Sequence, residues 1–241
     1  MRVSVIGDSH IAALSRAYEH LRAEGGWLDG IEISFGGASA REWKSGSFID
    51  HGDRVEFTAE RFRKLFGASS LRQGKAGKHI VGLNVFYHSA PVWRSRQWLD
   101  HVPMGMAGNR LSSNVIEQII LDDQEANLKL VAALRRMGMR LFAIEAPRPF
   151  MTHLAITRGG LKPEVVAAVD SLYRNTIRTA LDGLAVPTLT LPPGCFDASG
   201  FMKPNYKSET AGDQHHANLM FGMEMLQRMI PFLLEHFARK A

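Results

Sequence analysis

The sequence contains a single cysteine, Cys195, among its 241 residues. One cysteine excludes an internal disulfide framework and any metal site built from several cysteines, and it predicts a reducing compartment, the cytoplasm. We expect Cys195 itself to be a small packed side chain. Long apolar runs are also missing. The N-terminal run, Arg2–Ile6, is too short for a signal peptide, and no segment approaches the length of a membrane span. The sequence therefore predicts a soluble protein that is not exported.

Acidic residues are in the minority, with 24 Asp and Glu against 29 Lys and Arg, for a net charge of +5. The densest basic segment contains Arg61, Arg63, Lys64, Arg72, Lys75 and Lys78. No nucleic-acid-binding motif or aromatic stacking pattern accompanies it, so a solvated face is favoured over a nucleic-acid partner. Attraction of an anionic substrate or polymer is the alternative.

Apolar segments with strand and helix periodicity alternate along the chain, which predicts a parallel sheet covered by helices on both faces. Strands are expected at Arg2–Ile6, Ile31–Phe35, Ile80–Asn84, Arg140–Ile144 and Thr188–Leu191. Helices are expected after Ser9, over Ser113–Met137, from Pro163 to Leu181 and over Ala217–Ala238. With 45% hydrophobic residues and no internal repeat, residues 1–241 are expected to form one α/β domain.

The first candidate block, Gly7-Asp8-Ser9-His10, directly follows the first expected strand. Helical spacing resumes after it, which places Ser9 at a strand-to-helix corner. Backbone N–H groups are unpaired at a helix start, and the helix dipole is positive there, so a developing oxyanion is stabilised. The alternative is that Asp8 or Ser9 only caps this helix.

The second candidate block, Asp213-Gln214-His215-His216, precedes the last expected helix. Asp213 and His216 are three residues apart, which lets the carboxylate reach the ring Nδ1. A serine needs a neutral imidazole to accept its proton, and the imidazole needs a carboxylate to orient it. Ser9, His216 and Asp213 supply these three groups. Helix capping by Asp213 and a solvated histidine are the alternatives, and His215 is the natural control because its spacing is wrong.

These blocks resemble those of the SGNH, or GDSL-like, hydrolases over most of the chain. That family carries Gly-Asp-Ser near the N-terminus, a glycine block after the second strand, an asparagine block after the third, and Asp-x-x-His near the C-terminus. His10 replaces the leucine of GDSL. The resemblance implies a three-layer α/β/α fold with a five-stranded parallel sheet, flavodoxin-like, and a catalytic triad of Ser9, Asp213 and His216.

The resemblance also implies an oxyanion hole formed by the backbone N–H groups of Ser9 and Gly37. Gly37 belongs to the block Gly36-Gly37-Ala38-Ser39, in which Gly36 is the less favoured register. Without the other blocks, this segment would be interpreted as a tight turn whose glycines permit positive φ.

The asparagine block leaves two interpretations open. If the third strand ends at Asn84, the side-chain amide of Asn84 is the third oxyanion donor by resemblance. If Val85-Phe86-Tyr87 extends the strand, His88 faces the site instead, and the oxyanion hole rests on Ser9 and Gly37 alone. One lost donor commonly costs about a hundredfold or more in rate, so the choice matters for activity.

Two longer connections are expected to shape the acyl or leaving-group pocket, because long loops in a compact domain often form lids or binding surfaces. The first, Ser89–Ser112, contains Trp93, Trp98, Met104 and Met106, and the second, Pro147–Lys162, contains Phe150, Met151 and Arg158. Packing of these side chains into a satellite core is the alternative.

The resemblance implies hydrolysis of a carboxylic ester through an acyl-enzyme on Ser9, with deacetylation of a carbohydrate as the implied reaction and no metal or organic cofactor required. A sugar hydroxyl in place of water would make the same site an O-acetyltransferase.

A catalytically silent SGNH-like domain that binds an acylated glycan or a protein is one alternative. A flavodoxin-like phosphate or nucleotide binder is another. It lacks a P-loop lysine and Gly-x-Gly-x-x-Gly, and it leaves Asp213 and His216 unexplained. The sequence does not determine the oligomeric state.

Overall fold

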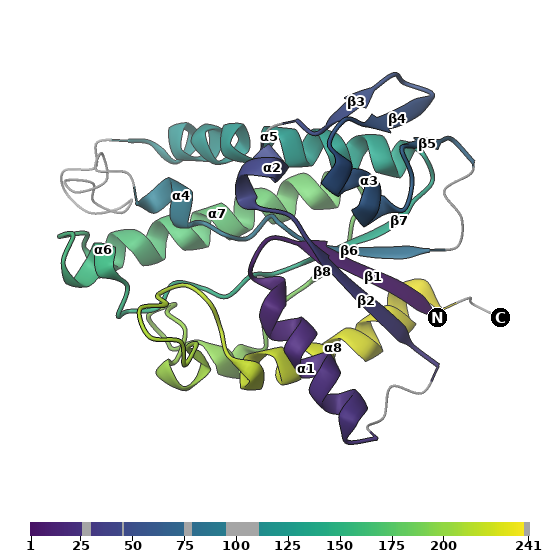
Figure 1. The fold of residues 1–241 in the computed structure, drawn as a ribbon. Coiled ribbons are helices and arrows are strands. Elements are labelled where there is room, and N and C mark those ends of the chain that lie inside the picture. The colour runs from purple at the N-terminus through teal and green to yellow at the C-terminus, as the bar shows by residue number, and fades with distance from the viewer. Residues whose placement is uncertain (26–29, 45, 75–78, 95–110, 239–241) are drawn as a thin grey trace.

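Figure 1 shows the computed structural model of the chain. It describes residues 1–25, 30–44, 46–74, 79–94 and 111–238. Trp98, Met104 and Met106 of the first long connection lie outside the described residues, as do Lys75 and Lys78 of the basic segment. Among the described helices, none is both long and apolar enough to cross a bilayer.

The centre of the molecule is a five-stranded parallel sheet with the strand order β2-β1-β6-β7-β8. Its strands are β1 (Arg2–Gly7), β2 (Glu32–Gly37), β6 (Ile80–Asn84), β7 (Arg140–Ile144) and β8 (Thr188–Leu189). β6 is buried along its whole length, as expected for a central strand of a parallel sheet. The predicted parallel sheet is therefore confirmed, with β8 ending two residues earlier than expected.

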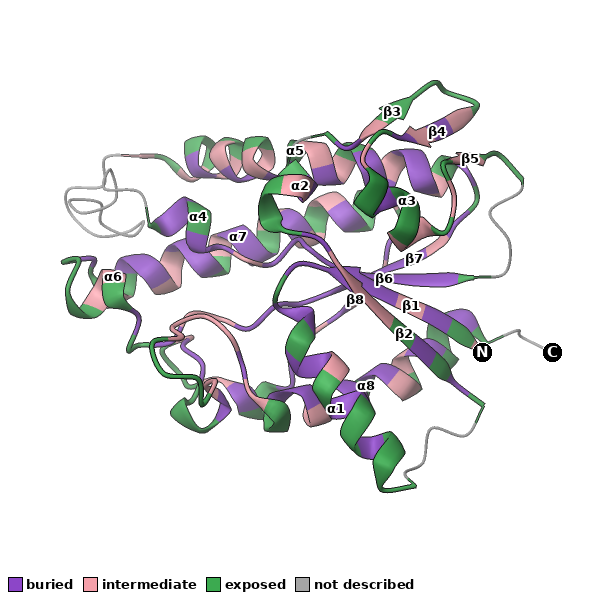
Figure 2. Ribbon diagram, in the orientation of Figure 1, coloured by how far each residue is buried: buried purple, intermediate pink, exposed green. Residues whose placement is uncertain are grey.

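Helices cover both faces of this sheet (Figure 1). On one face α1 (Ile11–Ala23) packs against α8 (Leu219–Phe237), and on the other α5 (Ser113–Arg136) packs against α7 (Pro163–Gly183). Figure 2 shows that buried residues line the strands and the sides of the helices that face them. The buried apolar side chains form two clusters, one on each face. The predicted three-layer α/β/α architecture is thus confirmed.

A second sheet of three antiparallel strands was not predicted. It consists of β3 (Phe48–Asp50), β4 (Arg54–Phe57) and β5 (Ser70–Arg72), and it lies next to α2 (Ala40–Lys44) and α3 (Glu60–Phe66). Strands this short give too few alternations for a pattern to stand out in the sequence. Ring contacts between Trp43 and Phe62 at 4.6 Å and between Phe57 and Phe66 at 4.4 Å hold the insertion together.

The basic side chains of this insertion lie on its surface. Arg61, Arg63 and Lys64 are exposed on α3, and Arg72 is exposed on β5. This exposure agrees with the solvated face expected from the sequence. The remaining short elements are α4 (Ala90–Trp93), α6 (Leu154–Thr157) and the 3₁₀ turns η2 (Pro193–Cys195) and η3 (Pro204–Tyr206).

The glycines of the two N-terminal blocks have a different role from the one expected. Gly7, Gly36 and Gly37 are the last residues of β1 and β2, and none of them has positive φ. The interpretation of Gly36 and Gly37 as a tight turn with positive φ is therefore wrong. A Cβ on Gly7 would lie 2.6 Å from the carbonyl oxygen of Asn84, and one on Gly36 would lie 2.6 Å from Leu65 Cδ2. Close packing against the Asn84 backbone, and not a turn, requires glycine at Gly7, whereas an added Cβ at Gly36 would clash only with the end of the Leu65 side chain.

Candidate active site

Ser9 lies in the three-residue corner between β1 and α1, as the sequence predicts. The corner is built by Asp8, whose Oδ1 accepts the backbone N–H of His10 at 2.9 Å and whose carbonyl accepts that of Ile11 at 3.3 Å. Asp8 and His10 are buried, whereas Ser9 is exposed. His10, the residue before α1, makes no side-chain capping bond, and Ser9 makes none to the first turn, so the interpretation of Ser9 as a simple helix cap is wrong. Of the two capping candidates, only Asp8 binds a backbone N–H at this corner.

Asp213 and His216 lie in the segment before α8, which packs against α1. His216 Nε2 lies 2.8 Å from Ser9 Oγ, and His216 Nδ1 lies 3.0 Å from both carboxylate oxygens of Asp213. The structure thus brings together three side chains from the two ends of the chain. Asn218, and not Asp213, caps α8, because its Oδ1 accepts the N–H of Phe221 at 3.2 Å.

The Asp213 carboxylate is held as an acceptor by its own segment. Its Oδ1 accepts the backbone N–H groups of His215 at 3.0 Å and His216 at 3.1 Å. Partial burial alone would raise the pKa of Asp213, but these two hydrogen bonds and the neighbouring His216 ring outweigh it and lower the pKa well below the usual value. Asp213 is therefore ionised at neutral pH, the state that orients an imidazole and stabilises its charged form.

The Ser9 backbone N–H is free within the described part of the chain, whereas the neighbouring N–H groups of Asp8, His10 and Ile11 all donate. An unpaired N–H next to the Ser9 hydroxyl, at the start of a helix, can donate a hydrogen bond to a negatively charged oxygen and stabilise it. Gly37 lies opposite Gly7 at the carboxyl end of the adjacent strand. Its role as a second donor remains a prediction.

Asn84 is the last residue of β6, so the interpretation in which the strand continues through Tyr87 is wrong. It lies opposite Gly7, is buried, and donates one side-chain N–H to the carbonyl of Ile144 at 3.0 Å. One amide hydrogen is thus held between β6 and β7. Its role as the third oxyanion donor rests on the other hydrogen and remains a prediction.

A small pocket of about 20 Å³ is lined in part by His10 and His215, the chain neighbours of Ser9 and His216. Its apolar wall comes from both long connections and includes Ala90, Trp93, Pro147, Pro149 and Phe150. Its polar lining includes His10, His88, His153 and His215. Trp93 and Phe150 are buried, so these side chains pack into the core and also form the pocket wall, while Met151 and Arg158 are exposed.

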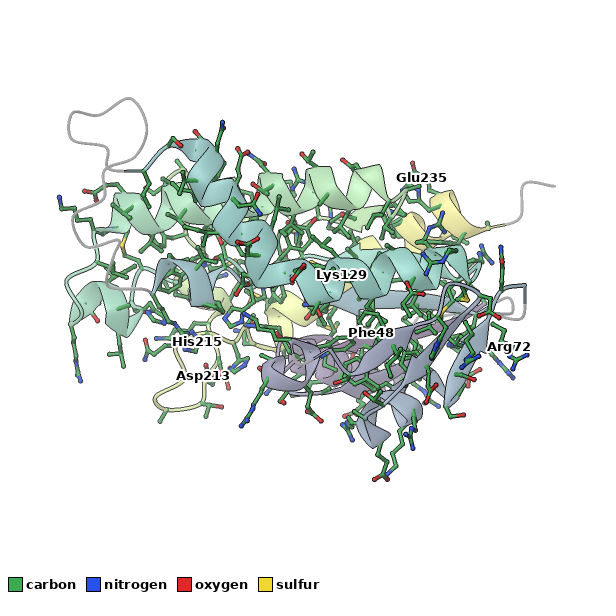
Figure 3. The ribbon with its side chains drawn as sticks, turned by 90° about the horizontal axis from the view of Figure 1, so that it is seen from above. Phe48, Arg72, Lys129, Asp213, His215 and Glu235 are labelled. Carbon is green, nitrogen blue, oxygen red and sulfur yellow. The ribbon has the colours of Figure 1, made fainter. Side chains whose placement is uncertain are left out.

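Arg94 places a cation against two histidines of the pocket lining. Its Nη2 lies 2.7 Å from Nδ1 and 2.6 Å from Nε2 of His215, and 3.4 Å from His153 Nε2. Burial, followed by the charge of Arg94 among other neighbours, lowers the pKa of His215 to about 4, and burial lowers the pKa of His153 to about 4 as well. Both rings are therefore neutral at pH 7. Figure 3 shows Asp213 and His215 at the opposite end of the molecule from Arg72 of β5.

The sequence did not point to this lining of histidines and arginine. The sequence pattern indicates His215 only as a control for His216, and His10 only as a replacement for the leucine of GDSL. His88 was expected to face the site only if β6 were longer, yet it lines the pocket although β6 ends at Asn84. The signal was the excess of histidine, ten in the chain, four of which line this pocket.

No protein-family model matches the chain, and no curated protein matches it significantly. Solved structures do match. An acetyl xylan esterase, AlAXEase, is 12% identical, with 97% of this chain and 100% of that chain covered and a TM-score of 0.50. LAE5, an alpha/beta hydrolase enzyme from the metagenome of Lake Arreo, Spain, is 13% identical, with 100% and 96% covered and a TM-score of 0.50. A protein from Lactobacillus plantarum is 16% identical, with 98% and 97% covered and the same TM-score.

These likenesses extend over nearly the whole chain and concern the fold. The chain has the three-layer α/β/α fold of these proteins, as its sequence predicts. Fold alone does not specify a reaction, because one fold supports many activities, so the function has to be argued from the side chains of the site.

Proposed function

We propose that this protein is a serine esterase that hydrolyses a carboxylic ester through an acyl-enzyme on Ser9. The observation that carries the proposal is the contact of 2.8 Å between Ser9 Oγ and His216 Nε2, with the opposite ring nitrogen held 3.0 Å from the Asp213 carboxylate. A chain of hydrogen bonds runs from the nucleophile through the base to the orienting carboxylate. Ser9 is exposed, so a substrate can reach it.

In the first half of the reaction Ser9 Oγ attacks the ester carbonyl and His216 Nε2 takes the hydroxyl proton. The carbonyl oxygen becomes an oxyanion, for which the free N–H of Ser9 is a donor, with Gly37 and Asn84 as the predicted further donors. When the tetrahedral intermediate collapses, the ester C–O bond breaks and the leaving alcohol receives the proton from His216. The acyl group remains on Ser9.

In the second half a water molecule replaces the alcohol. His216 takes one of its protons, the remaining hydroxide attacks the acyl carbon, and collapse of the second intermediate returns the proton to Ser9 and releases the carboxylic acid. Asp213 stays ionised throughout and stabilises the His216 imidazolium, because its lowered pKa keeps it from accepting the proton.

For the substrate we propose a short acyl group, acetyl above all, on a carbohydrate. The small volume of the neighbouring pocket supports a short acyl chain, and its wall of Trp93 and Phe150 suits a methyl group. The likeness to an acetyl xylan esterase supports the carbohydrate only through the shared fold. The cytoplasmic location stays a prediction from the single cysteine.

The test is hydrolysis of p-nitrophenyl acetate and of acetylated xylo-oligosaccharides by the wild type, Ser9→Ala and His216→Ala. We expect both variants to lose at least about a thousandfold in kcat. His215→Ala is the matched control, since it removes an adjacent histidine that makes no contact with Ser9, and it should keep its turnover within about tenfold. Equal rates for Ser9→Ala and the wild type would refute the proposal.

A wild type that folds but releases no acetate would call for a second assay with the same proteins. Mass spectrometry of xylo-oligosaccharides incubated with p-nitrophenyl acetate would reveal acetyl transfer to a sugar hydroxyl in place of water. Neither hydrolysis nor transfer would favour a silent binding domain.

A further inference from the structure

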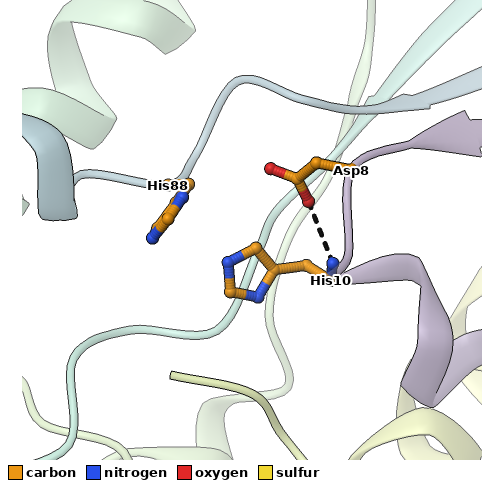
Figure 4. Close-up of side chains that lie close together, drawn as sticks. All are labelled: Asp8, His10 and His88. Carbon is orange, nitrogen blue, oxygen red and sulfur yellow. Dashed lines mark hydrogen bonds between the residues drawn. The ribbon is translucent and has the colours of Figure 1, made fainter. Parts of the chain in front are cut away.

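Three side chains that the esterase mechanism does not use converge beside Ser9. They are Asp8 and His10 of the β1–α1 corner and His88 of the segment that follows β6 (Figure 4). Each offers one ligand atom, and these three atoms lie within 4.8 Å of one another. The sequence brings them together because β1 and β6 are adjacent parallel strands whose carboxyl ends share one edge of the sheet.

Each of the two histidine rings has one nitrogen without the partner that buried polar atoms normally have. His10 Nδ1 and His88 Nε2 are inaccessible to solvent and make no hydrogen bond within the described part of the chain. His10 is 5% exposed, and its ring centroid lies 4.5 Å from that of His88. In Figure 4 the unpaired nitrogen of each ring lies on the side away from Asp8, so the carboxylate is faced by the other nitrogen of each ring.

The Asp8 carboxylate has no cationic side chain as a partner among the described residues. It is buried, and its Oδ1 accepts the backbone N–H of His10, which fixes the orientation of the group. Figure 4 shows its second oxygen directed away from that hydrogen bond, on the side of His88. Buried carboxylates without a cationic side chain are commonly neutralised by a metal ion or by a proton.

We propose that Asp8, His10 and His88 form a binding site for one divalent transition-metal ion, with Zn²⁺ as the representative of the class. One carboxylate oxygen and two imidazole nitrogens are a ligand set typical of Zn²⁺ and its first-row neighbours, whereas Ca²⁺ and Mg²⁺ select oxygen ligands. Three protein ligands leave coordination positions open, so water or another small ligand completes the shell.

The protonation states of the two histidines at neutral pH suit this role, whereas burial raises the pKa of Asp8. Burial lowers the pKa of His10 to about 3 and that of His88 to about 2, so both rings are neutral and carry a free lone pair. Metal binding therefore does not have to displace a proton from either imidazole at pH 7. The ligand atoms already lie within 4.8 Å of one another, close to the separations that Zn–N and Zn–O bonds of about 2.0–2.2 Å impose.

The ion would lie next to the proposed catalytic residues, since the rings of His10 and His216 are 5.0 Å apart. The inference nevertheless stands apart from the esterase proposal. It rests on three other side chains, and it is tested without substrate. A protein without esterase activity can still bind zinc here, and an active esterase can fail to bind it.

The experiment is isothermal titration of Zn²⁺ into tag-free, chelator-treated protein at pH 7. We expect one ion per wild-type chain, and a loss of affinity of more than about tenfold in Asp8→Asn and in His88→Gln. The matched controls are His153→Gln and His215→Gln, which alter pocket histidines outside the cluster and should leave the affinity unchanged. Mg²⁺ and Ca²⁺ should give no stoichiometric binding.

Folding of the variants is checked by melting in chelator. His88 is only half-buried, so His88→Gln keeps the test valid even if Asp8→Asn does not fold. Zn²⁺ should raise the melting temperature of the wild type and not that of His88→Gln. Absence of stoichiometric binding, undiminished affinity in folded His88→Gln, or loss of binding in the His153 and His215 controls would each overturn the proposal.

Discussion

Gly222 of α8 lies directly against the backbone of Ala13 of α1. A Cβ added at Gly222 would stand 2.1 Å from the Ala13 carbonyl oxygen and 2.9 Å from Ala17 Cβ. This contact sets how closely the two helices approach. Because Ser9 precedes α1 and His216 precedes α8, the same contact positions the candidate nucleophile relative to its base.

We therefore expect Gly222→Ala to lower both stability and esterase activity. Overpacking of this kind costs about 1–3 kcal/mol, and separation of the helices would lengthen the contact between Ser9 and His216. Urea unfolding and kcat with p-nitrophenyl acetate measure the two effects. Gly183→Ala is the matched control. Gly183 is the last residue of helix α7, and a Cβ added there would have no atom within 4 Å. An unchanged kcat in Gly222→Ala would show that the helix contact does not set the geometry of the site.

Asp213→Asn should reduce kcat by about a thousandfold to ten-thousandfold while leaving KM nearly unchanged. The amide cannot stabilise the His216 imidazolium and does not fix the same tautomer. Steady-state kinetics with p-nitrophenyl acetate measure the loss. Asp197→Asn is the control, because Asp197 Oδ1 likewise accepts two backbone N–H groups, those of Ser199 at 2.9 Å and Phe201 at 3.1 Å. Similar losses in the two variants would point to folding and not to catalysis.

The size of the pocket beside Ser9 predicts a preference for short acyl groups. We expect kcat/KM for p-nitrophenyl acetate to exceed that for the butyrate by at least about tenfold, since each methylene that does not fit a pocket costs about 1–3 kcal/mol. Phe150→Leu should narrow this ratio by enlarging the pocket. Phe201→Leu alters an equally buried ring that does not line the pocket, so it should leave the ratio unchanged. A butyrate preference in the wild type would contradict this reading of the pocket.

Stability should fall when the pH is lowered from 7 to 5 in the presence of chelator. The pKa of His10 drops from 6.5 in the unfolded chain to about 3 in the folded protein, so between these values the unfolded state binds more protons. The contribution of His10 to the free energy of unfolding is therefore complete above pH 6.5. It decreases towards pH 3, by at most about 1.4 kcal/mol per pH unit.

The variant that tests this is His10→Leu, whose unfolding free energy should depend less steeply on pH than that of the wild type. The raised pKa of Asp8, caused mainly by burial, acts with the opposite sign, but Asp8 is present in both proteins. Urea denaturation at several pH values between 7 and 5 gives the two slopes. Parallel slopes would mean that His10 is not buried in its neutral form.

Much of the fold could be predicted from local patterns in the sequence. The five central strands and the helices after Ser9, Ser113, Pro163 and Ala217 were predicted because parallel strands are continuous apolar runs and covering helices show a regular period. The antiparallel sheet at residues 48–72 was not predicted. Its strands have three or four residues and are held by the rings of Trp43, Phe57 and Phe62, which come together only after folding.

The sequence by itself determined the chemical types of the site, since Ser9 at a strand-to-helix corner and the spacing of Asp213 and His216 are local features. Tertiary structure decided the rest. Ser9 and His216 are 207 positions apart, and they meet because the parallel sheet collects strand ends on one edge and Gly222 lets α1 and α8 approach closely. Likewise, the environments of His10, His88 and His215 depend on burial and on neighbours from distant segments, which no local pattern contains.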